Sequence, residues 1–357
     1  MSETPQTAED AQRQHPGRRA PGRPRGLALV LVLGSLTALG PLTIDLYLPA
    51  LPQVSGDLHI SQGVTQLTLT AFMTGTAVGQ LVIGPLSDTL GRRRPLLTGL
   101  AVYVAAGVLC ALAPNSCVLV AMRLVQGLAG AAGIVIARAV VRDLHDGLAA
   151  ARLLSSLMLV SGTAPVLAPV LGAQLLRLTA WRGVFTALAL LGLVVLAAAA
   201  ALLPETLPAS RRRAGGLSTT LHTMLGLLRE RRFTGYLLTG SLGFAALFAY
   251  IAGSSFALQQ VYGASPQTYS LLFALNSIGL VATGRLNGRL LLGRFPSHRV
   301  LTAGLALLVC AGAALVLLVT ATHAGLPWIA AALFLTACPV GMILPTTTAL
   351  CLQRAPH

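Results

Sequence analysis

Two charged residues interrupt long apolar stretches of this sequence, and their side chains can take part in proton transfer. Asp45 is the only carboxylate well inside such a stretch, and Arg123 is the only arginine clearly within one. If these stretches cross a membrane, each charge costs about 2.5–3.5 kcal/mol on insertion scales. A carboxylate kept there faces a wet cavity, pairs with a cation or exchanges a proton. Asp45 and Arg123 are therefore the candidate proton-coupling residues.

Both charges fall at a similar depth when they are counted from the same surface. At a helical rise of about 1.5 Å per residue, each lies roughly 10 Å below it. Equal depth permits an ion pair or a shared network of water, but it does not require contact. The alternatives are an interfacial Asp45 and an Arg123 whose side chain extends to the headgroups. Gln126 lies one turn from Arg123 on the same helix face, where it can hydrogen-bond a neighbour or a substrate.

The composition indicates a membrane protein. Of the 357 residues, 55% are hydrophobic and 10% are charged, whereas soluble domains carry about 25% charged residues. This excludes a soluble enzyme with a single core. The net charge of +15 comes from arginines without any lysine, and no soluble basic domain is visible that would bind nucleic acid. The five cysteines form no CxxC motif, which indicates small buried apolar residues rather than metal ligands.

Uncharged stretches long enough to cross a membrane recur along the chain. We expect ten spans, at about residues 27–51, 64–87, 96–113, 116–137, 153–176 and 183–203, with two more in 233–284 and two in 300–353. With the N-terminus inside, all but three arginines fall in cytoplasmic segments; Arg177 and Arg182 fall outside, and Arg123 falls within a span. Basic residues of membrane proteins are distributed in this way. The pattern predicts a multi-pass protein of a bacterial cell membrane with both termini in the cytoplasm.

The longest polar break divides the predicted spans into two unequal groups. We expect an all-α polytopic membrane fold in five parts: a basic cytoplasmic tail at 1–26, a six-helix bundle at 27–203, a cytoplasmic linker at 204–232, a partial four-helix bundle at 233–353 and a short tail at 354–357. Two bundles joined by a cytoplasmic linker are typical of a transporter that binds its substrate between them.

Proline and glycine interrupt two of the predicted spans. Gly40, Pro41 and Pro49 flank Asp45 in the first span. The fifth span carries Gly162, Pro165, Pro169 and Gly172. Broken helices free backbone groups, which are tolerated where protein or a cavity satisfies them. The alternative is an ordinary kink, because both residue types are common in membrane helices.

A compact charged hinge lies between the second and third spans, at residues 84–95. It combines Asp88 at a helix end, Gly91 for a tight turn and an arginine triplet. This stretch resembles the signature that the major facilitator superfamily carries in the same loop. Five residues match the signature: Gly84, Asp88, Gly91, Arg92 and Arg93. Thr89 departs from it, since a basic residue is usual there.

Further stretches resemble the same family. Residues 123–127 are similar to its motif in span 4, whose arginine is linked to proton transfer, and residues 162–172 are similar to its antiporter motif in span 5. Residues 45–52, with Trp181–Arg182 and residues 204–206 beside span 6, resemble the Bcr/CflA-type drug-resistance branch. The resemblance covers about residues 27–350 and implies a drug:proton antiporter that is nominally built from twelve spans. It therefore implies a chain that stops after about span 10, so that Asp88 and Arg92 would lack their partner in span 11.

Several neutral residues are candidates for contact with a substrate. Two lie in the first half, Tyr47 and Gln126, and five lie in the second half: Tyr250, Ser254, Phe256, Phe273 and Asn276. Such side chains suit uncharged or weakly cationic amphipathic compounds. At the same spacing, aromatic residues also simply pack.

These features together predict a transporter and not an enzyme. No HExxH motif, no second intramembrane carboxylate and no phosphate-binding loop occurs. We expect proton-coupled efflux of small amphipathic compounds or antibiotics by alternating access, with a small-molecule substrate, the proton and the lipid bilayer as partners, and with no nucleic acid, metal, ATP or cofactor. Two alternatives stay open: a truncated membrane remnant that does not transport, and an importer of a small metabolite.

Overall fold

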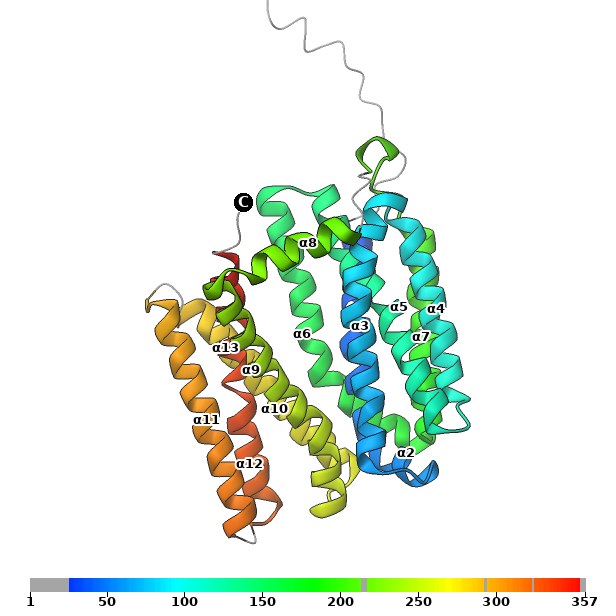
Figure 1. The fold of residues 1–357 in the computed structure, drawn as a ribbon. Helices are drawn as coiled ribbons and strands as arrows, with labels where there is room; N and C mark the ends of the chain where they lie inside the picture. The colour runs from blue at the N-terminus through cyan, green and yellow to red at the C-terminus, as the bar shows by residue number, and fades with distance from the viewer. Residues whose placement is uncertain (1–25, 213–216, 292–293, 323, 354–357) are drawn as a thin grey trace, which may run out of the picture.

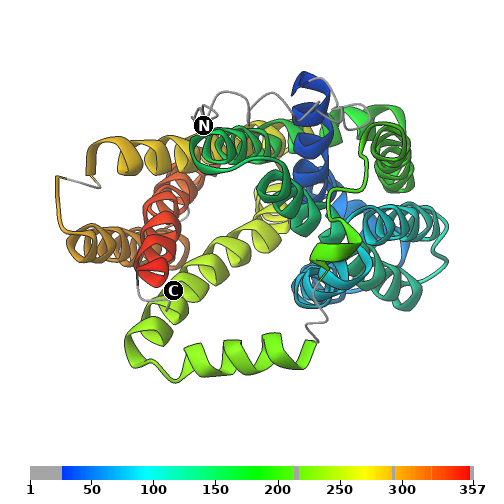
Figure 2. The same cartoon turned by 90° about the horizontal axis from the view of Figure 1, so that it is seen from above.

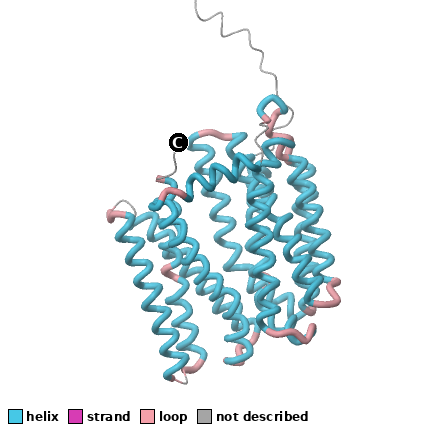
Figure 3. The backbone as a smooth tube through the Cα atoms, viewed as in Figure 1, coloured by secondary structure: helices cyan, strands magenta, loops and turns pink. Residues whose placement is uncertain are grey.

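The computed structural model describes residues 26–212, 217–291, 294–322 and 324–353. Helices joined by short loops make up these ranges, and no strand occurs in them (Figure 3). The tails expected at 1–26 and 354–357 lie outside the described residues, apart from Gly26, which begins the first helix.

Within the described ranges, ten helical segments are long and apolar enough to cross a membrane, which confirms the expected number. The first half consists of α1 (Gly26–Asp45), the 3-10 turn η2 (Leu48–Ala50), α2 (Leu51–Asp57), α3 (Gln62–Leu90), α4 (Arg93–Ala111), α5 (Ser116–Leu144), α6 (Gly147–Leu178) and α7 (Trp181–Leu202). Here α1, η2 and α2 form one span.

The second half contains four spans. It consists of α9 (Arg231–Phe256) with the π-helical turn η4 (Ala257–Val261), α10 (Pro266–Leu286) with the π-helical turn η5 (Asn287–Leu291), α11 (Ser297–Ala321), α12 (Leu326–Ala337) and α13 (Val340–Leu352). The last two helices form one span. Between the halves lie the short turn η3 (Ala209–Arg211) and α8 (Leu217–Leu228). The all-α fold with a six-helix and a four-helix bundle is therefore confirmed.

The two ends of the bundle differ in chemistry, and we name them by it. α1 begins and α3 ends at the arginine-rich end. The arginines at this end include Arg92–Arg94, Arg142, Arg211 and Arg212. The opposite end, which contains α2, is the glutamine end. The glutamines gathered there are Gln62, Gln66, Gln259, Gln260 and Gln267. Three spans begin at the glutamine end with a side-chain cap, from Ser61, Asn115 and Ser265. These caps accept backbone N–H groups that the first helical turn leaves unpaired.

Glycines allow α3 and α5 to pack at short distance. A Cβ atom at Gly75 or Gly79 of α3 would collide with the backbone of α5, and one at Gly127 of α5 would collide with the backbone of Phe72. Small residues let membrane helices approach closely, and dispersion contacts then stabilise the pair. Since α5 carries Arg123, this packing also fixes the position of the buried arginine.

The two halves meet at the glutamine end and separate toward the arginine-rich end (Figure 1). One buried apolar cluster includes residues of both halves, among them Leu48, Phe256 and Phe273. Two further clusters lie within one half each, one around Leu36 and Tyr103 and one around Ile343. Viewed along the spans, the halves lie side by side, and α8 runs along the edge of the bundle between them (Figure 2).

Candidate functional site

Asp45 is the last residue of α1, and its side chain is buried, with the residue 5% exposed. The helix continues through Pro41 but stops at Asp45, and the chain resumes as the turn that contains Pro49. The helix break predicted on both sides of Asp45 therefore occurs only on its C-terminal side. A Cβ atom at Gly172 of α6 would collide with the Leu46 carbonyl, so this glycine lets α6 pack against the break.

A cavity of about 140 Å³ between the halves places Asp45 beside residues of the second half. Its wall includes Tyr250 and Phe273, whose rings stack with centroids 5.7 Å apart. The amide of Asn276 donates a hydrogen bond of 2.7 Å to the Tyr250 hydroxyl. The structure thus brings together the predicted proton carrier and three of the predicted substrate residues, in an apolar wall that contains one carboxylate.

The predicted antiporter helix forms the other wall of this cavity. Gly162 and Pro165 of α6 line it, and the helix remains continuous through Pro165 and Pro169. A second cavity, of about 330 Å³, shares Gly162 and Val281 with the first and extends between α6 and α10 to Arg285. This second cavity is open at the surface of the bundle, where Leu167 and Ile278 are exposed.

Arg123 lies in a cage of aromatic rings inside the first half, and its side chain is fully buried. The guanidinium carbon lies 4.5 Å from the ring centroid of Phe72, 5.3 Å from that of Tyr47 and 5.6 Å from that of Phe185. One nitrogen, Nη1, donates to Gln126 Oε1 at 2.9 Å. Since the aromatic faces attract a desolvated cation, the side chain does not extend to the headgroups.

Asp45 and Arg123 form no ion pair in this structure. The four ion pairs present among the described residues, defined by N···O distances of 4.0 Å or less, do not include them. The sequence predicts a similar depth for Asp45 and Arg123, but the two side chains face different surroundings. Arg123 faces the interior of the first half, whereas Asp45 faces the cavity between the halves.

The remaining predicted substrate residues lie away from the Asp45 cavity. Tyr47 and Gln126 belong to the surroundings of Arg123. Phe256 is part of the apolar cluster at the glutamine end. Ser254 lines a different groove, of about 490 Å³, between α9, α11 and α12.

The hinge between α3 and α4 is a network of ion pairs centred on Arg92. Its guanidinium binds Asp88 and donates to Ser87 Oγ at 2.7 Å, and its Nε donates to Asp143 Oδ2 at 3.0 Å. Burial alone lowers the pKa of Arg92, but the hydrogen bonds that it donates to Asp143 and Asp88, with the negative charges of these two residues, outweigh burial and raise the pKa. Gly91 adopts a φ of 90°, which favours glycine. Within the first half, Arg92 therefore pairs with both Asp88 and Asp143.

Glu205, just beyond α7, also binds the hinge, through its backbone. Its carboxylate accepts the backbone N–H of Arg92 at 2.8 Å and that of Arg93 at 3.2 Å, so it caps the start of α4. Burial alone raises the pKa of Glu205, but the backbone hydrogen bonds from Arg92, Leu207 and Arg93 and the charge of Arg212 outweigh it and hold the pKa below its usual range.

Sequence reasoning did not assign a role to Asp143 or Glu205. Both are among only ten acidic residues in the chain, and each lies beyond the end of a predicted span and close to arginines. In a chain with so few acids, each carboxylate near the arginines is a candidate partner. That scarcity was the available signal.

We predict that Glu205→Gln destabilises the protein at neutral pH by about 1 kcal/mol, the typical value of a helix cap. Because the folded-state pKa is lowered, this stabilisation is present above the pKa of a free glutamate and is lost as the pH falls through the folded-state value. The difference in apparent melting temperature between variant and wild type should therefore shrink to zero in acid.

Glu230→Gln is the matched control. Glu230 is exposed and precedes α9 without a side-chain capping bond, so its substitution should leave the melting temperature unchanged. Equal effects of the two substitutions at neutral pH would show that Glu205 does not act as a cap.

Comparison with known proteins gives relatives for most of the chain. It is 37% identical over 336 residues to YdgK, an MFS-type transporter of Bacillus subtilis, covering 93% of this chain and 82% of that protein. It is 31% identical over 260 residues to a bicyclomycin resistance protein homologue of Haemophilus influenzae, covering 73% of this chain and 65% of that protein. The multidrug resistance protein MdtL of Escherichia coli is 29% identical over 290 residues, with 81% of this chain and 72% of MdtL covered.

The fold is also that of solved transporters. A bacterial homologue of the human lysosomal transporter Spinster superposes with a TM-score of 0.71 at 16% identity, over 91% of this chain and 74% of that one. The family model of the major facilitator superfamily matches residues 33–357. This family comprises transporters, which confirms the prediction that the protein is a transporter and not an enzyme. The chain belongs to the major facilitator superfamily.

Proposed function

We propose that this protein is a proton-coupled exporter of small amphipathic compounds across the bacterial cytoplasmic membrane. The observation that carries the proposal is the position of Asp45, a buried carboxylate without an ion-pair partner among the described residues. It lies at a helix break and lines a cavity between the two halves. A carboxylate in such a place can hold either a proton or a cationic part of a substrate.

The proposed orientation puts the arginine-rich end in the cytoplasm. Arginines gather there at the ends of α3 and α5 and before α8, whereas Arg177 and Arg182 lie at the glutamine end. Basic residues are retained on the cytoplasmic side during insertion. Both termini then lie in the cytoplasm.

In this orientation, the structure corresponds to a state closed on the outside. Side-chain hydrogen bonds between the halves occur at the glutamine end. They join Gln62 to Gln260, Gln66 to Ala252, Ser255 to Leu48, Gln259 to Pro49 and Gln267 to Ala173, at 2.7–3.4 Å. On the side away from these bonds, the Asp45 cavity adjoins the second cavity between α6 and α10, which reaches Arg285. An exporter takes up its substrate in such a state.

Competition at Asp45 would couple the two fluxes. The stacked rings of Tyr250 and Phe273 offer an apolar surface, and the carboxylate offers one negative charge beside it. Protonation from outside removes that charge, so it weakens binding of a weakly cationic substrate and favours release. Energy comes from the proton gradient, without ATP or a cofactor. Arg123 takes no direct part in this scheme, because its cage holds it apart from the cavity.

The relatives support the direction of transport. Two of them are named for resistance to bicyclomycin and to multiple drugs. Resistance follows from export, so we extend the same direction to this chain. Import of a metabolite with the same fold remains the competing function, and the next experiment separates the two.

Asp45→Asn should abolish resistance while leaving membrane insertion intact, because asparagine cannot bind and release a proton. The measurement is growth of cells on a panel of antibiotics that includes bicyclomycin, with wild type, variant and empty vector compared. We expect wild type to raise the tolerated concentration of at least one compound, and Asp45→Asn to return it to the level of the empty vector.

Asp146→Asn is the control, since Asp146 is exposed before α6 and its side chain makes no capping bond there. It should behave as wild type. Undiminished resistance from Asp45→Asn under a proton gradient would refute the coupling scheme. Greater drug sensitivity caused by the wild-type protein would indicate an importer.

Alternating access predicts that the glutamine end must open in each cycle. In a background without native cysteines, Gln62→Cys and Gln260→Cys can be joined by a short bifunctional thiol reagent, because the two side chains touch in this state. We expect the joined protein to stop transport, and each single cysteine variant to keep it after the same treatment. Full transport by the joined protein would show that this contact does not open.

A further inference from the structure

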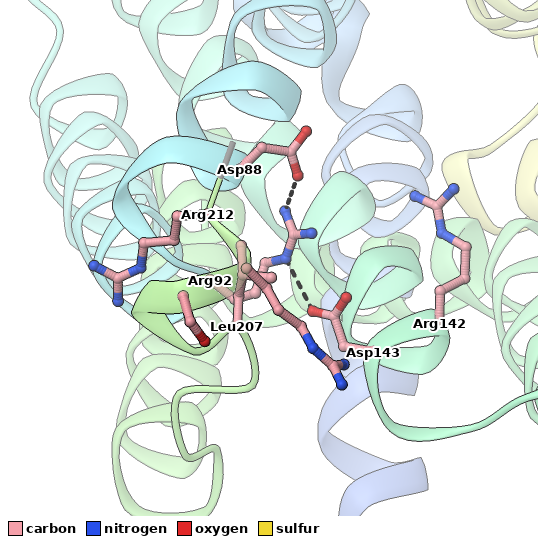
Figure 4. A pocket seen from close by; sticks show the side chains of 8 residues that line it. Asp88, Arg92, Arg142, Asp143, Leu207 and Arg212 are labelled. Atoms are coloured by element: carbon pink, nitrogen blue, oxygen red, sulfur yellow. Dashed lines mark hydrogen bonds and ion pairs between the residues drawn. The ribbon is translucent and has the colours of Figure 1, made fainter. Parts of the chain in front are cut away.

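A large cavity at the arginine-rich end shares no lining residue with the Asp45 cavity. Its volume is about 600 Å³. The side chains that line it come from the end of α3, the hinge, the end of α5 and the segment after α7, and they are Asp88, Arg92, Arg142, Asp143, Leu207, Ser210, Arg211 and Arg212 (Figure 4). Four of these eight residues are arginines.

The charges that line this cavity do not cancel. Arg92 binds both carboxylates, those of Asp88 and Asp143, and Asp143 also accepts a hydrogen bond from Thr206 at 3.0 Å. Arg212 lies 4.0 Å from Glu205. The side chains of Arg142 and Arg211 make no hydrogen bond or ion pair with another described residue. The acids are therefore occupied, and positive charge remains in excess around an open space.

The segment that follows the cavity has the character of a membrane-surface helix. α8 runs across the direction of the spans and along the edge of the bundle (Figures 1 and 2). Met224, Leu225 and Leu228 are exposed on it, with Leu225 at 61%. Arginines lie on both sides of this helix, at Arg211–Arg212 and at Arg231–Arg232. Apolar side chains flanked by arginines suit the boundary between acyl chains and headgroups.

We propose that this cavity binds the phosphate headgroup of an anionic phospholipid, with Arg142 and Arg211 as the principal ligands and α8 lying in the headgroup layer beside it. A guanidinium offers paired N–H donors that match phosphate oxygens. The exposed apolar residues of α8 favour a lipid over a soluble phosphate, because a soluble ligand would leave them in water. This site joins the hinge of the first half to the linker between the halves, so lipid bound there would hold the linker against the bundle.

The test measures lipid binding and needs no transport assay. Purified protein is delipidated and mixed with vesicles of phosphatidylcholine containing a minor share of phosphatidylglycerol, and the bound phosphatidylglycerol is quantified by native mass spectrometry. We expect wild type to retain phosphatidylglycerol. The pair Arg142→Gln and Arg211→Gln should bind it about 30-fold more weakly, since one arginine near an anionic surface contributes about a fivefold factor.

The control pair is Arg152→Gln and Arg299→Gln, which removes the same charge from exposed arginines at the same end but outside the cavity. It should bind as wild type does. Arg142→Lys with Arg211→Lys should bind more tightly than the glutamine pair but more weakly than wild type, because lysine keeps the charge without the paired donors. Equal loss in both glutamine pairs would overturn the site in favour of general charge attraction. Binding of inorganic phosphate without binding of phosphatidylglycerol would also overturn it.

Discussion

The structure depends on how an apolar medium treats ionised side chains. In hydrocarbon, a charge without compensation costs several kcal/mol, so each buried charge needs specific surroundings. Arg123 has aromatic faces and one amide oxygen around it, which stabilise a cation that must stay charged. Asp45 has a cavity and a helix break, which suit a group that changes its charge. The two side chains are thus accommodated in different ways, and their separation supports the proposal that the carboxylate is the group that exchanges protons.

Charge also distinguishes the contacts within the first half from the contacts between the halves. At the arginine-rich end, ion pairs and capping bonds join α3, α4, α5 and the segment after α7 within the first half. Across the halves, the side-chain bonds at the glutamine end are neutral. A neutral hydrogen bond contributes about 0.5–1.5 kcal/mol net, so a few of them hold the glutamine end together only weakly. Stronger ionic contacts there would oppose alternating access.

Local patterns in the sequence predicted most of the fold. The ten spans follow from runs of apolar residues, and the hinge follows from Gly91 and the arginine triplet. The sequence did not predict that Asp45 and Arg123 face different surroundings, because depth fixes one coordinate of a side chain and not the direction in which it points. The sequence also did not predict the glutamine contacts, because the hydrogen-bond partners of Gln259 and Gln267 lie in the other half of the chain. α8 lies within a segment expected only as a linker, because twelve residues are too few to count as a span.

Infrared difference spectroscopy of the membrane-embedded protein, recorded as the pH is changed, tests most directly whether Asp45 is the exchanging group and is independent of Arg123. The expected result is a carboxyl signal that appears with protonation, vanishes in Asp45→Asn and keeps its midpoint in a folded Arg123→Gln variant. Absence of an Asp45-dependent signal would contradict proton exchange at this residue. A midpoint shifted by more than about one pH unit in Arg123→Gln, equivalent to about 1.4 kcal/mol, would contradict the separation of the two charges.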